Sequence, residues 1–241
     1  MFDDENQPLL DYEKNIDEDI DEAINKKIRN GFISKVLGIV FYQLIIATIV
    51  VSFGLFNSNF KHLLLTSTSL YIICIIGTFV LILLPLFFKD IFSRVPTNYI
   101  VLTLFTFCFS YIVAVYTCLF RPRSVLVDLF LTILIVGALI IYAINTKKDF
   151  TFMGGILCVS LIILIFSSLI LIFFPIPFLQ LLYDIAGLII FSLYLIFDVQ
   201  LLVGDRGNKF SEDEYILAAM NIYLDIINIF IKLLSIFGER R

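Results

Sequence analysis

Four carboxyl side chains lie within or beside the long apolar segments of this chain: Asp128, Asp184, Asp198 and Asp225. If those segments cross a membrane, a charged carboxylate at bilayer depth costs at least ~2.5–3.5 kcal/mol. Asp225 lies near the middle of the last segment, and Asp198 lies several residues inside the end of the segment before it. Two carboxyl groups in one dry site cannot both ionise cheaply, so we expect them to share a proton. The pair is interpreted as a pH-sensitive latch or a cation site, with burial for structure alone as the alternative.

The spacing alone does not establish that these two side chains meet. In a helical hairpin that turns near residues 205–210, Asp198 lies closer to the turn than Asp225 by roughly 9 Å, at 1.5 Å per residue. A simple hairpin therefore places Asn221 opposite Asp198. Only a tilt or a longer last helix would bring Asp225 to that position.

The last apolar segment also carries a narrow polar stripe made of Asn221, Asp225, Asn228 and Lys232. Spacings of four, three and four residues place these side chains within roughly a 60° arc of a helix. A stripe with charges of both signs must face protein or water, which predicts a last helix surrounded by other helices, with Asn221 and Asn228 supporting the carboxyl pair. For Lys232, pairing with an acid of the far half and snorkelling to the surface are both open, and snorkelling is favoured.

The remaining charged candidates lie near the ends of apolar segments. Asp128 and Asp184 are interpreted either as wetted surface acids or as parts of an ion path, and either one is a possible partner for Lys232. Lys89 and Arg94 follow the second segment. They are either positive-inside anchors or a latch, in which one of them is the cationic partner of Asp198.

The composition identifies the elements that must position these residues. The chain has 241 residues, is 60% hydrophobic and has a mean hydropathy of +1.01, whereas soluble domains are about 45–50% apolar. The apolar runs have helical length and lack the alternation of a membrane barrel. We therefore predict an all-α membrane protein, a seven-transmembrane-helix bundle with the C-terminal helix central. Its predicted spans are residues 34–56, 65–88, 99–119, 125–145, 152–174, 178–203 and 212–237.

The amino-terminal residues have a different character. Residues 1–22 contain ten acids against Lys14 alone, and we predict an acidic, disordered cytosolic tail over residues 1–30, ahead of a transmembrane domain over 31–241. Glu5, Leu9 and Leu10 fit an acidic dileucine sorting motif. Basic residues favour the amino-terminal side of the membrane by eleven to five, which predicts a cytosolic amino terminus.

Two further patterns bear on the site. Ser211 and Glu214 fit a capping box at the start of the last helix. The chain shows neither a CxxC pair nor a Cys/His spacing typical of a metal site. We expect no cofactor and no nucleic-acid partner, and any metal ligand set stays unknown.

Four stretches resemble the Bax-inhibitor (Lifeguard, transmembrane BAX inhibitor motif) family. They are EDEY and AAMNIYLDIINIF at residues 212–215 and 218–230, FDVQLLVG at 197–204, and NTKKDFT at 145–151. The resemblance extends from about residue 33 to the end of the chain. It implies a seven-helix bundle with the last helix central, a calcium leak pathway in endomembranes (endoplasmic reticulum, Golgi or endolysosomal), and suppression of cell death.

The resemblance also assigns roles to residues. It implies that Asp198 and Asp225 form the pH-sensing pair that gates the leak, and that Arg94 or Lys89 latches Asp198. Calcium is then the permeating or weakly bound ion, and the lipid bilayer and cell-death or calcium-release membrane proteins are the partners. The chain departs from the family pattern at Asp184, at Lys232, and in the loop where Arg121 and Arg123 precede Asp128.

Three other functions are compatible with parts of the sequence. A non-conducting anti-apoptotic membrane protein that acts by binding partners is the main alternative. An intramembrane aspartyl protease is remote: Tyr183-Asp184 supplies one motif, but residues 202–205 lack the first glycine of the other. A seven-helix receptor lacks support from an intracellular motif. We therefore expect that the chain is not an enzyme.

Overall fold

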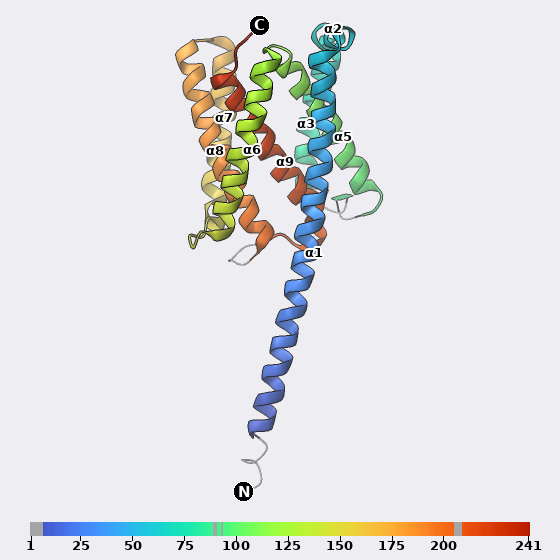
Figure 1. The fold of residues 1–241 in the computed structure, drawn as a ribbon, viewed down its shortest axis with the longest axis vertical. Coiled ribbons are helices and arrows are strands. Elements are labelled where there is room, and N and C mark those ends of the chain that lie inside the picture. The colour runs from blue at the N-terminus through green and yellow to red at the C-terminus, as the bar shows by residue number, and fades with distance from the viewer. Residues whose placement is uncertain (1–6, 89–90, 93, 205–208) are drawn as a thin grey trace.

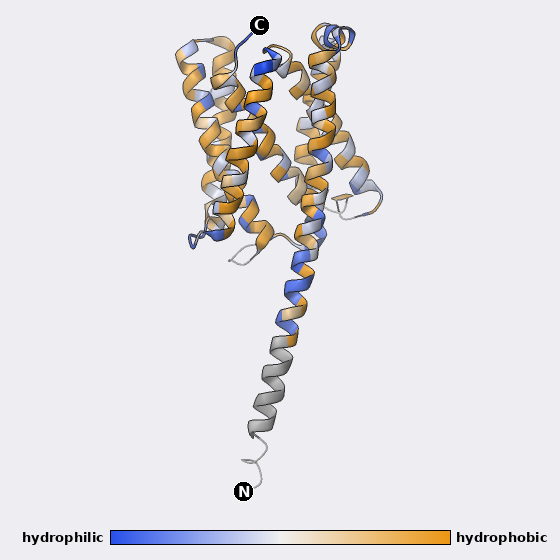
Figure 2. Cartoon of the chain, in the orientation of Figure 1, coloured by the Kyte–Doolittle hydropathy of each residue, from blue (hydrophilic) through white to orange (hydrophobic). Residues whose placement is uncertain are grey.

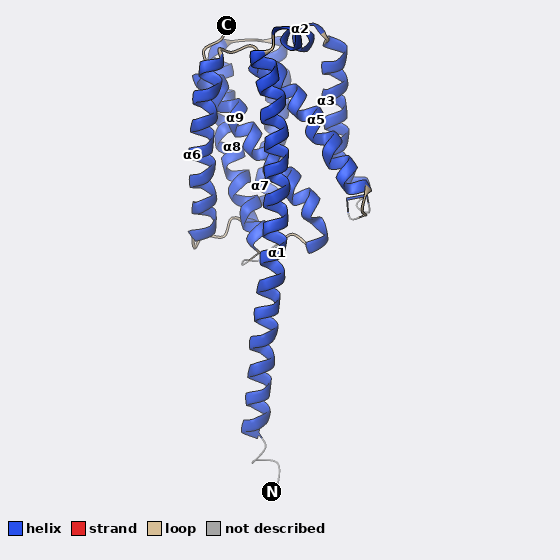
Figure 3. Ribbon diagram, turned by 45° about the vertical axis from the view of Figure 1, so that its right-hand side comes forward, coloured by secondary structure: helices blue, strands red, loops and turns tan. Residues whose placement is uncertain are grey.

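The computed structural model of this chain is an assembly of upright α-helices from which one long helix projects (Figure 1). It describes residues 7–88, 91–92, 94–204 and 209–241. Across these residues the regular secondary structure is helical (Figure 3), and an isolated β-bridge joins Phe120 to Arg240. The prediction of an all-α fold is confirmed.

Seven helices of the described residues are long and apolar enough to cross a membrane, as predicted. Their described bounds are α1 (Gln7–Phe56), α3 (Thr68–Phe87), α5 (Thr97–Thr117), α6 (Pro122–Asn145), α7 (Gly154–Phe173), α8 (Pro177–Val203) and α9 (Tyr215–Phe237). A short helix α2 (Ser58–Thr66) precedes α3, and single 3₁₀ turns η1 (Thr151–Met153) and η2 (Glu212–Glu214) precede α7 and α9. The predicted bounds of the second to seventh spans agree with these helices to within three residues.

Helix α1 is longer than the first predicted span. It begins at Gln7, so residues 7–30, for which the composition predicted disorder, continue the first membrane helix. Once residues 31–56 are helical, each preceding residue adds a hydrogen bond without a new nucleation step, and Glu22 and Lys26 have the spacing of a favourable helical ion pair. The residues from Ile20 to Ile28 are exposed, and this part of α1 projects beyond the other helices (Figure 2).

Local sequence signals explain where several helices start and stop. Pro122 and Pro177 occupy the first turns of α6 and α8, where a missing N–H costs nothing. Asn57 caps α2 by accepting the Phe60 N–H at 3.0 Å. The predicted capping box forms, with the Ser211 N–H donating to Glu214 at 2.9 Å. Helix α8 ends at Gly204, whose φ of 72° is left-handed and therefore suits glycine.

Helix α9 is the most buried membrane-length segment. In its most apolar stretch of 18 residues, 67% is buried, against 50% or less in the corresponding stretch of each of the other six. It packs against α1, α5, α6 and α8. It runs obliquely from the end where α1 enters the bundle to the opposite end, near the C-terminus (Figure 1). The polar groups on α9 therefore lie where other helices can reach them. We call the end that holds the C-terminus the far end.

The outward faces of the bundle are apolar. Large side chains on α3 and α7, such as Ile73, Phe79, Ile163 and Phe166, are more than half exposed, and Figure 2 shows an apolar band over the height of the bundle. Such a surface is suited to lipid, since helices satisfy their backbone polar groups internally.

Candidate functional site

Asp198 of α8 and Asp225 of α9 lie next to each other inside the bundle. Their side chains are 3% and 4% exposed, and their carboxyl groups are within hydrogen-bonding reach of each other. Within the described residues the charged neighbour of Asp198 is Asp225, and Oδ2 of Asp225 lacks a hydrogen-bond donor there. Two bare carboxylates in such a place would repel strongly, so the geometry suits one shared proton or a bound cation.

The contact between α8 and α9 is the most extensive one between any two helices of the described residues. Asp198 lies five residues before the end of α8 at Val203, and Asp225 lies ten residues after the start of α9 at Tyr215. In a hairpin of parallel axes this difference would separate the two by roughly 7.5 Å. The packing of α8 against α9 nonetheless brings the two carboxyl groups together.

Tyr194 is a neighbour of the pair that the sequence analysis did not select. It lies one turn before Asp198 on α8, and its phenol is close enough to both carboxyl groups for their charges to act on it. Residues four apart share a helix face, so the spacing from Asp198 was a signal that pointed to Tyr194.

Two of the motifs behind the family resemblance contact each other. Gln200, two residues after Asp198, is 3% exposed. Its Nε2 donates to the carbonyl of Lys148 at 3.0 Å, and its Oε1 accepts the Phe150 N–H at 2.7 Å. Asp149 in turn accepts from the N–H and hydroxyl of Thr151. The loop before α7 is thus bound to the helix that carries Asp198.

Arg29 of α1 holds the end of α8, a role that its place in the acidic tail concealed. Its guanidinium donates to the carbonyls of Leu201, Val203 and Phe210 at 2.5, 3.2 and 2.8 Å. A Cβ on Gly204 would lie 2.7 Å from this guanidinium, so glycine also provides room for it. A cation at a helix C-terminus is favourable because the last carbonyls carry partial negative charge.

The structure describes one of the two predicted latch residues. Arg94 is exposed in the loop before α5, and Lys89 lies outside the described residues. A basic side chain that does bind this end of α8 is Arg29. Its hydrogen bonds go to backbone carbonyls.

The two asparagines of the polar stripe do not bind the carboxyl pair. Asn221 is exposed, and the amide of half-buried Asn228 donates to the Leu224 carbonyl of its own helix at 2.8 Å. A self-satisfied amide of this kind is a common way for a polar side chain to lie within an apolar helix.

The expectation that Lys232 snorkels to the surface is wrong. Its ammonium is buried, donates to Asp184 Oδ1 at 2.9 Å and lies 3.6 Å from the centre of the Tyr183 ring. Asp184 also accepts from Ser235 and, at 3.0 Å, from Gln180. A Cβ on Gly187 would lie 2.7 Å from the lysine stem, so this glycine makes room for the side chain. Pairing is preferred to snorkelling because the partner and the space are both inside the bundle.

Asp128, the other acid of the far end, has a different environment. It is 2% exposed, yet neither carboxyl oxygen has a hydrogen-bond partner in the described residues. It faces a cavity that it shares with Arg123, Ser124 and Glu239. The structure therefore leaves Asp128 apart from the Asp184–Lys232 ion pair. The phenol of Tyr116 is close enough to both acids for electrostatic interaction with each of them.

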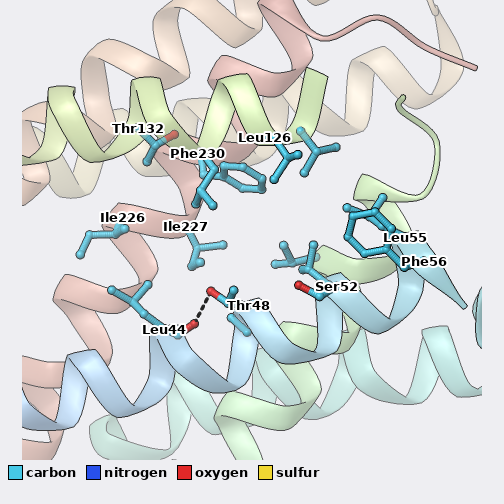
Figure 4. A pocket seen from close by; sticks show the side chains of 15 residues that line it. Leu44, Thr48, Ser52, Leu55, Phe56, Leu126, Thr132, Ile226, Ile227 and Phe230 are labelled. Carbon is cyan, nitrogen blue, oxygen red and sulfur yellow. Dashed lines mark hydrogen bonds between the residues drawn. The ribbon is translucent and has the colours of Figure 1, made fainter. Parts of the chain in front are cut away.

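A second cavity, of about 100 Å³, lies between α1, α6 and α9 (Figure 4). Ile226, Ile227 and Phe230 of α9 line it opposite Leu44 and Thr48 of α1. The Thr48 hydroxyl donates to the Leu44 carbonyl and the Thr132 hydroxyl to the Asp128 carbonyl, each at 2.8 Å. Most of the remaining lining is apolar, with Ser52 as a further polar residue.

Two further predictions concern ligands and sorting. In the described residues no group of three or more His, Cys, Asp or Glu side chains is close enough to form a metal centre. Of the sorting motif, Glu5 lies outside the described residues, and Leu9 and Leu10 lie in the first turn of α1.

These features define a multi-pass membrane protein with a buried carboxyl pair between its last two helices. A sequence model of the family described as "Inhibitor of apoptosis-promoting Bax1" matches residues 29–241. The chain belongs to this Bax inhibitor family.

Named relatives agree with this membership. Protein lifeguard 3 of Homo sapiens is 31% identical over 220 residues, which cover 90% of this chain and 71% of that protein. The BI1-like protein of Arabidopsis thaliana is 37% identical over 217 residues, covering 88% and 82%. Protein lifeguard 3 of Mus musculus is 30% identical over 220 residues, covering 90% and 71%.

Proposed function

We propose that this protein is a pH-sensitive, calcium-permeable leak channel of intracellular membranes that modulates calcium stores and restrains apoptosis. The observation that supports it most is the buried Asp198–Asp225 pair, which has no basic neighbour in the described residues. The printed name of the family, an inhibitor of apoptosis-promoting Bax1, supports the part that concerns cell death.

The proposed gate works by proton sharing. With one proton between them, the two carboxyl groups attract each other and hold α8 against α9. When that proton leaves, two carboxylates face each other in a poorly solvated site and repel. The helices separate at that end of the bundle, and the exposed carboxylate oxygens are ligands suited to a hard cation such as calcium.

The test is calcium flux into vesicles that contain only the purified protein. The leak should rise with pH, because higher pH removes the shared proton. In Asp225→Asn an amide replaces one acid, so the repulsion cannot arise and the leak should no longer respond to pH. Asp213→Asn, an exposed acid on η2, is the matched control and should keep the wild-type response. An unchanged pH response in Asp225→Asn would refute this gate.

The membrane and its sidedness belong to the same proposal. We propose endomembranes, with the amino terminus in the cytosol and the dileucine-type motif of Leu9 and Leu10 available to sorting adaptors. The excess of basic residues on the amino-terminal side of the membrane supports this orientation.

A second candidate function is a non-conducting protein that restrains cell-death or calcium-release proteins by binding them. The long exposed part of α1 favours it, since this helix is accessible beyond the bundle (Figure 1). Absence of flux from the purified protein would select this alternative. An aspartyl protease is disfavoured because Asp184, the acid of its Y-D motif, is bound to Lys232.

A further inference from the structure

Asp128 differs from the other three acids of the membrane helices because the described residues offer its carboxyl group no hydrogen-bond partner. Asp198 and Asp225 have each other, and Asp184 has Lys232, Ser235 and Gln180. Asp128 is equally buried, but both of its oxygens lack a hydrogen-bond partner in the described residues. A buried carboxylate without compensation is costly, so Asp128 either holds a proton or takes a partner from its surroundings.

The cavity beside Asp128 has the size and the donors for such a partner. It has a volume of about 240 Å³ and is lined by Ser124, Val127 and Leu131 of α6 and by Phe237 and Glu239 at the carboxyl end, besides Arg123 and Asp128. This is room for an ion with several of its waters. Asp128, Glu239 and Ser124 are among the residues that line it, and carboxylate and hydroxyl oxygens are ligands of hard cations.

The carboxyl-terminal residues are fixed over this cavity. Arg121 donates its N–H to the Glu239 carbonyl at 3.0 Å, and Arg241 donates its N–H to the Leu119 carbonyl at 3.0 Å. The Glu239 N–H donates to the Ser124 hydroxyl at 3.2 Å. Glu239 therefore has a defined place at the cavity, although its side chain is exposed.

The basic residues at the cavity leave Asp128 uncompensated. Arg121 forms an ion pair with Glu239 Oε1 at 2.8 Å, so a cation bound to Glu239 must compete with Arg121. Arg123 lines the cavity with an exposed side chain, and it is the internal competitor of a cation for Asp128.

We propose that Asp128, with Glu239 and Ser124, forms a low-affinity binding site for a hard divalent cation such as calcium at the far end of the bundle. Two carboxylates are few for such an ion, so the dissociation constant belongs to the range of about 10⁻⁴–10⁻³ M that weak calcium sites show. The site is separate from the Asp198–Asp225 pair and does not require the protein to conduct.

Terbium luminescence tests the proposal on the full chain in phosphatidylcholine nanodiscs, with calcium as the competitor. The chain has 11 tyrosines and no tryptophan, and Tyr116 is close enough to Asp128 to sensitise a bound terbium ion. One component of the terbium luminescence should depend on Tyr116, and calcium should remove this component. Tyr116→Phe should abolish it without changing calcium binding. Asp128→Asn should weaken calcium competition at this component by at least about tenfold.

Three variants separate this site from other effects. Glu239→Gln changes an exposed side chain and should weaken binding without affecting folding, whereas Arg123→Gln should strengthen it by removing the internal competitor. Asp21→Asn in the acidic part of α1 and Asp225→Asn at the carboxyl pair should leave the component unchanged. If Asp128→Asn binds calcium as the wild type does, or if no component depends on Tyr116, the proposal is overturned whatever the flux measurements show.

Discussion

At the scale of single residues, buried acids in this protein are stabilised in different ways, and each way has its own consequence. Asp184 is neutralised by Lys232 in a closed network with Ser235 and Gln180. Asp198 and Asp225 have only each other as charged neighbours in the described residues. Asp184 thus has a counter-charge, whereas two carboxyl groups in one poorly solvated site repel each other unless they share a proton. This contrast makes the second pair the better candidate for a gate.

The ion pair of the far end has a testable cost. Lys232→Met should lower the free energy of unfolding by about 3–5 kcal/mol, because it leaves the charge of Asp184 buried without its partner. The double variant Asp184→Asn/Lys232→Met should recover most of that loss, since an amide needs no counter-charge and can still bind Ser235. Unfolding in detergent micelles measures both. Equal stability of the single and double variants would show that the ion pair is not what stabilises this region.

At the scale of elements, the site depends on how the end of α8 is held. Asp198 lies just over one turn before this end, and the last carbonyls of α8 are bound by Arg29 from α1. Gln200 joins the same turn to the loop before α7. Helix α8 is therefore fixed at its end by two other parts of the chain, so movement of α8 at the carboxyl pair has to break these contacts.

Replacing Arg29 should loosen the α8–α9 connection. Hydrogen bonds from a charged donor contribute about 1.5–3 kcal/mol each, and Arg29→Gln cannot reproduce three of them. Backbone amides at residues 201–211 should then exchange with deuterium at least about tenfold faster, as measured by mass spectrometry. Lys27→Gln removes the same charge from an exposed position of α1 and should not change the exchange. If these amides exchange as slowly in Arg29→Gln as in the wild type, Arg29 does not hold this end of α8.

At the scale of the whole molecule, seven membrane-length helices place the start of α1 at Gln7 and the C-terminus at opposite ends of the molecule (Figure 1). In the proposed orientation, with a cytosolic amino terminus, the proposed gate at Asp198 would face the cytosol and the Asp128 cavity would face the other compartment. The proposed pH sensor and the proposed cation site then respond to different solutions.

This arrangement predicts the accessibility of tags in cells. After selective permeabilisation of the plasma membrane, antibody should reach a tag at the amino terminus or in the loop near residues 146–148. A tag at the carboxyl terminus should become accessible only after all membranes are permeabilised. Access to both termini in the first step would contradict a full crossing by α9 and indicate a re-entrant last helix.

The sequence by itself determined the class of fold, the positions of the membrane helices and the presence of a candidate carboxyl pair. These follow from local properties: long apolar runs fix the spans, proline and capping residues fix several helix starts, and Asp198 and Asp225 are conspicuous because charges are rare at such depth. The composition did not predict the helical structure of the acidic segment of α1, because its helicity depends on the helix that it continues and not on its own composition.

Only the tertiary structure decided which polar side chains meet. The packing of α8 against α9 brings Asp225 to Asp198 although residue counting favoured Asn221, and the space beside Gly187 accommodates Lys232 next to Asp184. It also gave Arg29 a partner more than 170 residues away in the chain and left Asp128 without one in the described residues. Helix periodicity gives the face of a residue, but the crossing angle and depth of each helix depend on packing over the whole bundle, and these decide the partners.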